Sequence, residues 1–206
     1  MIDAAKHLDR LSGHIPELAV CREDIRRAFE LLAGSFHRSG KLLLAGNGGS
    51  AADCEHWAAE LLKGFVSKRP LPDELRLKIG PAMADKLQGG LAAIPLPALM
   101  GFSTAWNNDA DPELVYAQAA LALGRPGDVL AAISTSGKSP NILRAAEVAR
   151  AVGLATVGLS GRSGGALAGL VDVCIRVPAD EVHQVQQLHL PVYHCLCLML
   201  EEEFFS

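Results

Sequence analysis

The chain has 206 residues, half of them hydrophobic, and its formal net charge at pH 7 is −4. This length and composition are sufficient to bury one sizeable core, so we predict a single domain over residues 1–206. The weakly acidic charge balance argues against a nucleic-acid or membrane-surface partner. No uncharged apolar run reaches about 18 residues, which argues against a transmembrane helix.

The cysteines and the first residues of the chain predict a cytoplasmic protein. The five cysteines are odd in number and form no CxxC pair, which is typical of small buried side chains in a reducing compartment. The N-terminal sequence MIDAAKHLDRL is charged and has no apolar stretch, so it does not resemble a signal peptide.

The start of the chain predicts two helices, a buried strand and a third helix. Apolar residues at helical spacing predict helices over 2–12 and 17–38, which together form an N-terminal helical region of residues 1–39. The apolar run KLLLA at 41–45 predicts a short strand. After it, the glycine cluster GNGGS predicts a turn, and the next helix should begin at Ser50 or just before it.

The stretch that follows this helix differs in composition from the rest of the chain. It is richer in charge and proline, and we assign residues 65–100 as an insertion. We expect one helix around 73–88 and a strand near 91–94 that Pro95 and Pro97 end early. The insertion is a solvated excursion or, alternatively, a lid or an oligomer contact.

The second half of the chain alternates apolar strands with helices. Apolar runs predict buried strands over 128–134, 154–160 and 172–178. Helices are expected over 113–124, 139–153 and 181–203, with a short one within SGGALAGLV at 163–171. The strands show no alternation of apolar and polar residues, so both of their faces should be buried. The fold class predicted is therefore α/β, a parallel sheet with helices on both faces.

Two loops at strand ends have the composition of a phosphate site. The first is Gly46-Asn47-Gly48-Gly49-Ser50, whose glycines let backbone N–H groups approach a ligand; an ordinary tight turn explains it equally well. The second is Ser134-Thr135-Ser136-Gly137-Lys138-Ser139, in which four hydroxyl groups precede a helix N-terminus and favour an anion. Neither loop has the dinucleotide-binding or the P-loop pattern.

Polar residues on two apolar helices suggest a metal or acid–base site. His56 and Glu60 are four residues apart, so they lie on one helix face. The C-terminal helix contributes His194 and a glutamine. Imidazole, carboxylate and amide groups suit zinc. Gln187 and His194 share a helix face, whereas Gln186 and His194 are offset by about 80°. Taken singly, each histidine of the C-terminal helix is better explained as a core residue with satisfied hydrogen bonds.

Together, the motifs resemble the SIS (sugar isomerase) domain, and within it the phosphoheptose isomerases. The matching stretches are GNGGSAADCEHWAAEL, NND at 107–109, GDVLAAISTSGKSPNI, DVCIRVP and VQQLHLPVYH. The resemblance implies a three-layer sandwich with a mostly parallel sheet and extra N-terminal helices. It also implies a homo-oligomer, which we expect to be a tetramer, with sites at subunit interfaces.

The family pattern also implies roles for single residues. Glu60 and His194 would be the acid–base groups of an aldose–ketose isomerisation through an enediolate. One zinc ion per subunit would be held by His56, Glu60, Gln186 and His194, because the register of VQQLH favours Gln186. The substrate would contact Asn47, Gly48, Gly49, Ser50, Asn108, Asp109, Ser134, Thr135, Ser136, Ser139 and Gln186. The alternative is a non-catalytic SIS module that binds a sugar phosphate or a protein partner.

Overall fold

The core of the protein is a five-stranded parallel sheet. The computed structural model describes residues 2–206; Met1, which the one-domain prediction includes, lies outside them. The strand order is β2-β1-β3-β4-β5, and every neighbouring pair is parallel. The strands are β1 (Leu42–Gly46), β2 (Ala93–Pro95), β3 (Val129–Ile133), β4 (Ala155–Ser160) and β5 (Val173–Arg176). The predicted parallel α/β sheet is confirmed.

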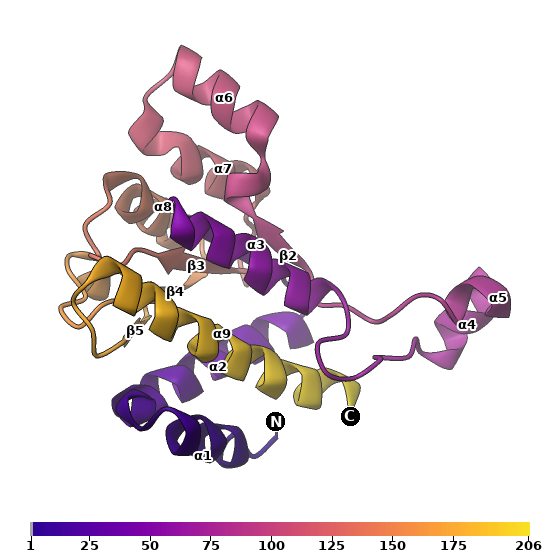
Figure 1. Cartoon of the computed structure of the whole chain (residues 1–206). Coiled ribbons are helices and arrows are strands. Elements are labelled where there is room, and N and C mark those ends of the chain that lie inside the picture. Colours follow the sequence, from indigo (N-terminus) through magenta and orange to yellow (C-terminus); the bar gives the residue numbers. More distant parts are fainter. Residues whose placement is uncertain (1) are drawn as a thin grey trace.

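Helices cover both faces of the sheet, as expected for buried parallel strands (Figure 1). One face packs on α2 (Arg22–His37), α3 (Gly49–Leu62) and α9 (Val182–Phe205), and the other on α7 (Val115–Leu123) and α8 (Pro140–Ala151). Successive residues of a strand point to opposite faces of the sheet. Leu42 and Leu44 belong to the core on the α2–α3–α9 face, and Leu43 and Ala45 belong to the second core, on the α7–α8 face. Within residues 2–206, no helix has the length and apolar composition needed to cross a membrane.

The order of the strands places a switch point between β1 and β3. The chain leaves β1 for β2 on one side and then returns to β3 on the other side of β1. Gly46 pairs in register with Ile133, so the two loops that follow these strands start level with each other. In such sheets ligands bind in the crevice at the carboxyl ends of the strands where the order reverses. Both candidate phosphate loops therefore lie at this crevice.

The helices α3 and α9 lie side by side and run in the same direction (Figure 1). The N-terminal helix α1 (Ala5–His14) packs against α9, and a 3-10 helix (Pro16–Cys21) leads from α1 into α2. Pro191 lies inside α9 without ending it. The α3–α9 pair carries the residues predicted to bind the metal, so its packing decides which of them can meet.

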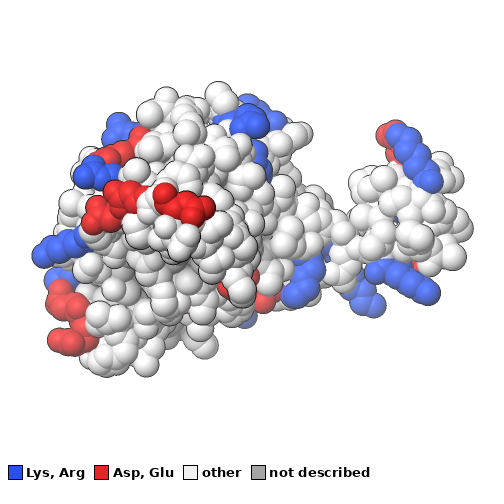
Figure 2. Space-filling model, turned by 90° about the horizontal axis from the view of Figure 1, so that it is seen from above, with Lys and Arg blue, Asp and Glu red and all other residues white. Residues whose placement is uncertain are grey.

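The insertion forms an arm that projects from the body of the protein (Figures 1 and 2). It carries two short helices, α4 (Asp73–Ile79) and α5 (Pro81–Ala84), and no residue of α4 is buried. The prediction of one helix over 73–88 is wrong, because Gly80 adopts a φ of 91° and separates the two helices.

Three further details differ from the sequence predictions. The helix predicted over 17–38 is split at Cys21 into the 3-10 helix and α2. The short helix predicted within 163–171 is only a 3-10 turn over Leu167–Gly169. Helix α6 (Met100–Asp109) was not predicted; it has no buried residue and packs on the second core through Phe102 and Trp106.

Candidate active site

The loop after β3 forms a cradle of hydroxyl groups at the N-terminus of α8. The hydroxyls of Ser134 and Ser139 are 3.1 Å apart, and Ser136 Oγ accepts a hydrogen bond of 3.2 Å from the backbone N–H of Lys138. Gly137 has a φ of 63° and lies against the carbonyl oxygen of Gly164, where a Cβ would clash. No side chain caps α8. Pro140 has no N–H, and the N–H of Ile142 donates to the Ser139 carbonyl oxygen at 3.1 Å, so within the described chain the N–H of Asn141 is the one in this first turn that remains available to an anion.

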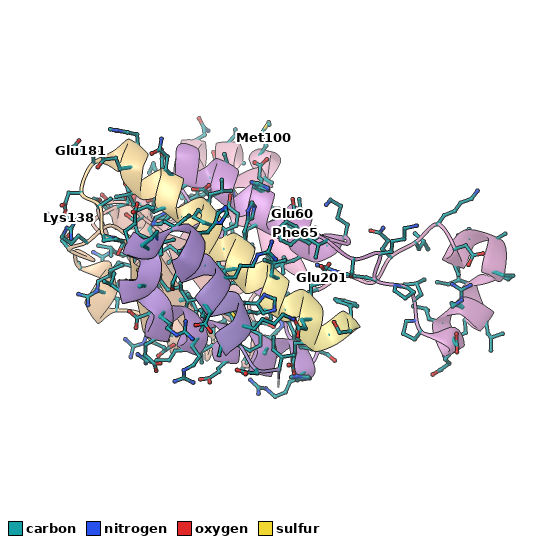
Figure 3. The ribbon with its side chains drawn as sticks, turned by 60° about the horizontal axis from the view of Figure 1, so that its bottom comes forward. Glu60, Phe65, Met100, Lys138, Glu181 and Glu201 are labelled. Carbon is teal, nitrogen blue, oxygen red and sulfur yellow. The ribbon has the colours of Figure 1, made fainter. Side chains whose placement is uncertain are left out.

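A small hollow lies beside this cradle. Its volume is about 160 Å³, and its lining includes Thr135, Ser136, Lys138 and Arg162. The guanidinium of Arg162 pairs with Asp180 at 3.0 Å, and Figure 3 shows Lys138 at this end of the molecule. The hollow therefore presents hydroxyl groups together with Lys138, while the charge of Arg162 is paired with Asp180 in the same lining.

A larger hollow of about 450 Å³ lies apart from the cradle, between α1 and α2. That larger hollow is lined by residues such as Ile2, Leu8, Arg26 and Phe29. None of the predicted site residues is part of its lining. The larger hollow and the predicted site therefore do not coincide.

The loop after β1 is joined to the hydroxyl cradle across the crevice. The side-chain amides of Asn47 and Asn141 exchange two hydrogen bonds of 2.9 Å, and Asn141 lies in the first turn of α8. The hydroxyl of Tyr116 donates to the Gly46 carbonyl oxygen at 2.9 Å. Gly48 has a φ of 55°, and nothing lies near the position of its missing Cβ. Ser50 is buried in the first turn of α3.

The two candidate glutamines have different surroundings. The side-chain amide of Gln186 lies against Gly49, at the position where a Cβ of residue 49 would stand, whereas Gln187 is exposed. Gln186 therefore faces the N-terminus of α3 and the glycine loop.

The acid–base candidates form one cluster farther along the same two helices. His56 Nε2 is 3.3 Å from Glu60 Oε1, and the rings of His56 and His194 are 5.0 Å apart between centroids. Lys63 donates to Glu60 Oε2 at 3.0 Å, and the ring of Phe65 lies 5.2 Å from that of His194. Figure 3 shows Glu60 and Phe65 next to each other beside α9.

The environment of His194 favours its neutral form. Burial lowers the pKa of His194, and the neighbouring His56 lowers it further, while Glu60 acts in the opposite direction. Its Nε2 atom is buried and has no hydrogen-bond partner among residues 2–206. A neutral imidazole with an unused nitrogen can accept a proton or bind a cation.

The residues predicted to contact the sugar lie on α6. Asn108 and Asp109 are exposed, and the Asn108 amide donates to Asp109 Oδ1 at 2.7 Å. Among residues 2–206, neither side chain has a hydrogen bond to the loops or to the His56–Glu60 cluster. One chain therefore does not bring these two residues into the cluster.

Comparison with known proteins shows the family. The SIS-domain family model matches residues 17–90 and 88–161. The phosphoheptose isomerase of Thiobacillus denitrificans is 40% identical over 200 residues, which cover 92% of this chain and 92% of that relative. The chain belongs to the phosphoheptose isomerase family of SIS-domain proteins. The resemblance seen in the sequence motifs is confirmed, and the protein is a phosphosugar isomerase.

Two solved phosphoheptose isomerases have similar structures. GmhA from Neisseria gonorrhoeae is 31% identical, with a TM-score of 0.73, and the match covers 94% of this chain and 98% of that one. The enzyme from Francisella tularensis is 28% identical, with a TM-score of 0.74, and covers 95% of this chain and 98% of that one. The likeness extends over nearly the whole isomerase.

The predicted zinc ligands of this isomerase fit zinc in donor type but do not all meet. His56, Glu60 and His194 share one cluster, and the unpartnered Nε2 of His194 is a free donor atom within it. Gln186 lies two turns earlier on α9, about 12 Å along the helix axis. Among residues 2–206, no three His, Cys, Asp or Glu side chains stand ready to hold a metal ion.

The sequence did not reveal the residues that support this cluster. Tyr193 contacts both His56 and Asp53, and Arg69 binds the backbone of Glu60 at the end of α3. The spacing of Asp53 and His56, three residues apart, could have indicated a shared helix face. No local pattern predicts Arg69, because its partner Glu201 is 132 residues away in the sequence.

Proposed function

We propose that this isomerase interconverts sedoheptulose 7-phosphate and D-glycero-D-heptose 7-phosphate. The family relatives carry the name phosphoheptose isomerase, which supports a seven-carbon substrate. The observation that carries the chemistry is the cluster of Glu60 and His194 around His56, on α3, which starts at the glycine loop, and on the neighbouring helix α9. An enzyme that isomerises a sugar phosphate needs both a site that binds the phosphate and an acid–base pair at the reacting carbons.

The reaction moves a proton between C1 and C2 of the sugar. In the proposed mechanism, Glu60 removes the proton from carbon and returns it to the neighbouring carbon. His194, held neutral by burial, transfers the proton between the two oxygen atoms. The negative charge of the enediolate is the main barrier, so groups near its oxygens contribute most to the rate.

The phosphate end of the substrate would be held at the crevice. Ser134, Thr135, Ser136 and Ser139 would bind the phosphate through hydroxyl and backbone N–H groups. The glycine loop at 46–49 and Ser50 would line the site beside it. Binding energy from this remote group orients the reacting carbons at Glu60 and His194.

We further propose one zinc ion per subunit, held by His56, Glu60, Gln186 and His194. When bound, zinc supplies a Lewis acid that offsets negative charge on a substrate oxygen. Coordination would lower the basicity of Glu60, so its two proposed roles compete. Measuring the activity with and without a chelator therefore shows which of the two roles of Glu60 dominates.

We propose that the protein acts as a homotetramer with sites between subunits. Within one chain Gln186 lies beside Gly49, whereas His194 lies beside His56 farther along the same helices. Asn108 and Asp109 also stand apart on the exposed helix α6. A second copy of the chain could supply the missing members of each site. A cytoplasmic location is proposed because all five cysteines are free.

A panel of phosphorylated ketoses tests the substrate assignment. We expect kcat/KM to be highest for sedoheptulose 7-phosphate and lower for hexulose and pentulose phosphates. Each assay is run on metal-free protein and on protein reloaded with zinc. Preference for a shorter sugar phosphate would contradict the proposed substrate, and equal activity with and without zinc would contradict the metal's role.

A further inference from the structure

Two linked polar side chains, Tyr193 and Asp53, reach His56 from the side away from Glu60. The hydroxyl of Tyr193 is 3.0 Å from His56 Nδ1 and 3.3 Å from Asp53 Oδ1. Tyr193 is fully buried and its ring stacks on Trp57, with centroids 5.7 Å apart and an interplanar angle of 14°. The opposite nitrogen of His56 faces Glu60 Oε1 at 3.3 Å. The packing therefore fixes Tyr193, and with it the polar neighbour of Nδ1, although the His56 side chain itself is 44% exposed.

The direction of the hydrogen bonds follows from the inventory of donors. The Tyr193 hydroxyl has one proton, and an ionised Asp53 can only accept. Asp53 Oδ2 is buried and has no partner among residues 2–206, so Tyr193 is the donor on which the carboxylate depends. A hydrogen bond to a charged acceptor is stronger than one to a neutral imidazole. The Tyr193 proton therefore goes to Asp53, and the Tyr193 oxygen accepts from His56.

We propose that Asp53 and Tyr193 are positioning residues that keep the proton of neutral His56 on Nδ1. The lone pair of Nε2 then faces the Glu60 side of the ring, where it can bind a cation or accept a proton from the substrate. The use of this lone pair in isomerisation rests on the proposed function, but the tautomer itself does not. In metal-binding histidines, a partner on the second nitrogen commonly sets the tautomer in this way.

Nuclear magnetic resonance of ¹⁵N-histidine protein tests the tautomer directly. Metal-free protein is studied at a pH at which His56 is neutral, and a His56→Gln spectrum identifies its signals. We expect protonated Nδ1 in the wild type. In Tyr193→Phe the acceptor is lost while the ring remains, so the proton should move to Nε2 and donate to Glu60.

The chain offers a matched control, because Tyr116 is its other tyrosine. Tyr116 is also buried and donates to the Gly46 carbonyl, so Tyr116→Phe makes the same chemical change without touching His56. The control should keep protonated Nδ1. Protonated Nε2 in the wild type, or an unchanged tautomer in Tyr193→Phe, would overturn the proposal. If Tyr193→Phe does not fold, Asp53→Asn should raise the Nε2-protonated fraction, and an unchanged spectrum would overturn it equally.

The affinity for zinc alone gives a second readout. Competition with a chromophoric chelator should show a dissociation constant about 10–100-fold higher in Tyr193→Phe than in the Tyr116→Phe control. Unchanged affinity would overturn the claim that the pair prepares His56 for a cation. Neither measurement uses a sugar phosphate, so the proposed substrate can fail while this inference stands.

Discussion

Glu60 is the residue on which the proposed chemistry depends most. Its carboxylate lies 3.3 Å from His56 Nε2 and 3.0 Å from the Lys63 ammonium, in the cluster that also holds His194. We expect Glu60→Gln to lower kcat by about 10²–10⁴-fold, the usual contribution of a general base. Binding of a non-isomerisable sugar alcohol phosphate, measured by calorimetry, should persist because the phosphate loops are distant from Glu60.

Ser136→Ala is the complementary variant, because Ser136 belongs to the phosphate cradle. It should weaken binding of the same alcohol phosphate and change turnover of bound substrate much less. If Glu60→Gln weakens binding as much as turnover, the carboxylate is a binding group and its assignment as the base fails.

His189 makes the stability of the fold depend on pH. It is fully buried, and neither ring nitrogen has a hydrogen bond of normal geometry within residues 2–206. Burial lowers its pKa from 6.5 to about 4, although the Ser160 backbone partly offsets this shift. The unfolded chain therefore binds the proton first as the pH falls. The stability is complete above pH 6.5 and is lost progressively toward pH 4.

Urea unfolding across this range measures the effect of His189. The shift corresponds to about 3 kcal/mol of unfolding free energy. His189→Gln should lose about that much less than the wild type between pH 6.5 and 4. The carboxylates titrate in both proteins and cancel in the comparison. Parallel pH profiles for the two proteins would show that His189 is not the group responsible.

At the scale of elements, one buried ion pair joins the base of the arm to α9. Arg69 Nε donates to Glu201 Oε1 at 2.7 Å, and both side chains are buried. Arg69 also donates to the carbonyl oxygens of Leu61 and Glu60, at 2.7 and 3.0 Å. Figure 3 shows Glu201 at the base of the arm, close to Phe65. The pair therefore joins α9, the arm and the helix that carries Glu60.

Removing one partner should destabilise the fold strongly. Arg69→Met leaves a buried carboxylate without its cation, which costs about 3–5 kcal/mol. Arg76→Met is the matched control, because its partner Asp85 is largely exposed in the same insertion and the loss should stay below about 1 kcal/mol. Urea unfolding measures both. Equal, small losses in the two variants would contradict the anchoring role of Arg69.

The sequence predicts elements well where apolar residues are continuous. The strand expected over 128–134 is β3 (Val129–Ile133), because a short continuous run of five apolar residues is typical of a buried parallel strand. Helix α6 was missed because GFSTAWNND has no apolar periodicity and the helix buries no residue. The two loops were found because glycines or hydroxyl residues directly follow predicted strands. The Arg69–Glu201 pair was not, because only the folded chain brings residues 132 positions apart together.

At the scale of the whole molecule, the separation of Gln186 from His194 predicts shared sites. Gln186→Ala and His194→Ala should each be inactive as separate proteins. If each site takes Gln186 from one subunit and His194 from another, co-refolding the two variants restores about a quarter of the sites by random assembly. Activity assays and a light-scattering mass test this prediction. No recovery in mixed oligomers, or a mass of one 21.7 kDa chain, would contradict it.

The most direct test of the central claim is proton exchange at the reacting carbons. The protein is incubated with sedoheptulose 7-phosphate in D₂O, and C1 and C2 of the sugar are followed by nuclear magnetic resonance. The account predicts that an aldose 7-phosphate forms with deuterium at C2, and that Glu60→Gln neither forms it nor exchanges. Absence of exchange by the wild-type protein with any heptulose, hexulose or pentulose phosphate would contradict the account.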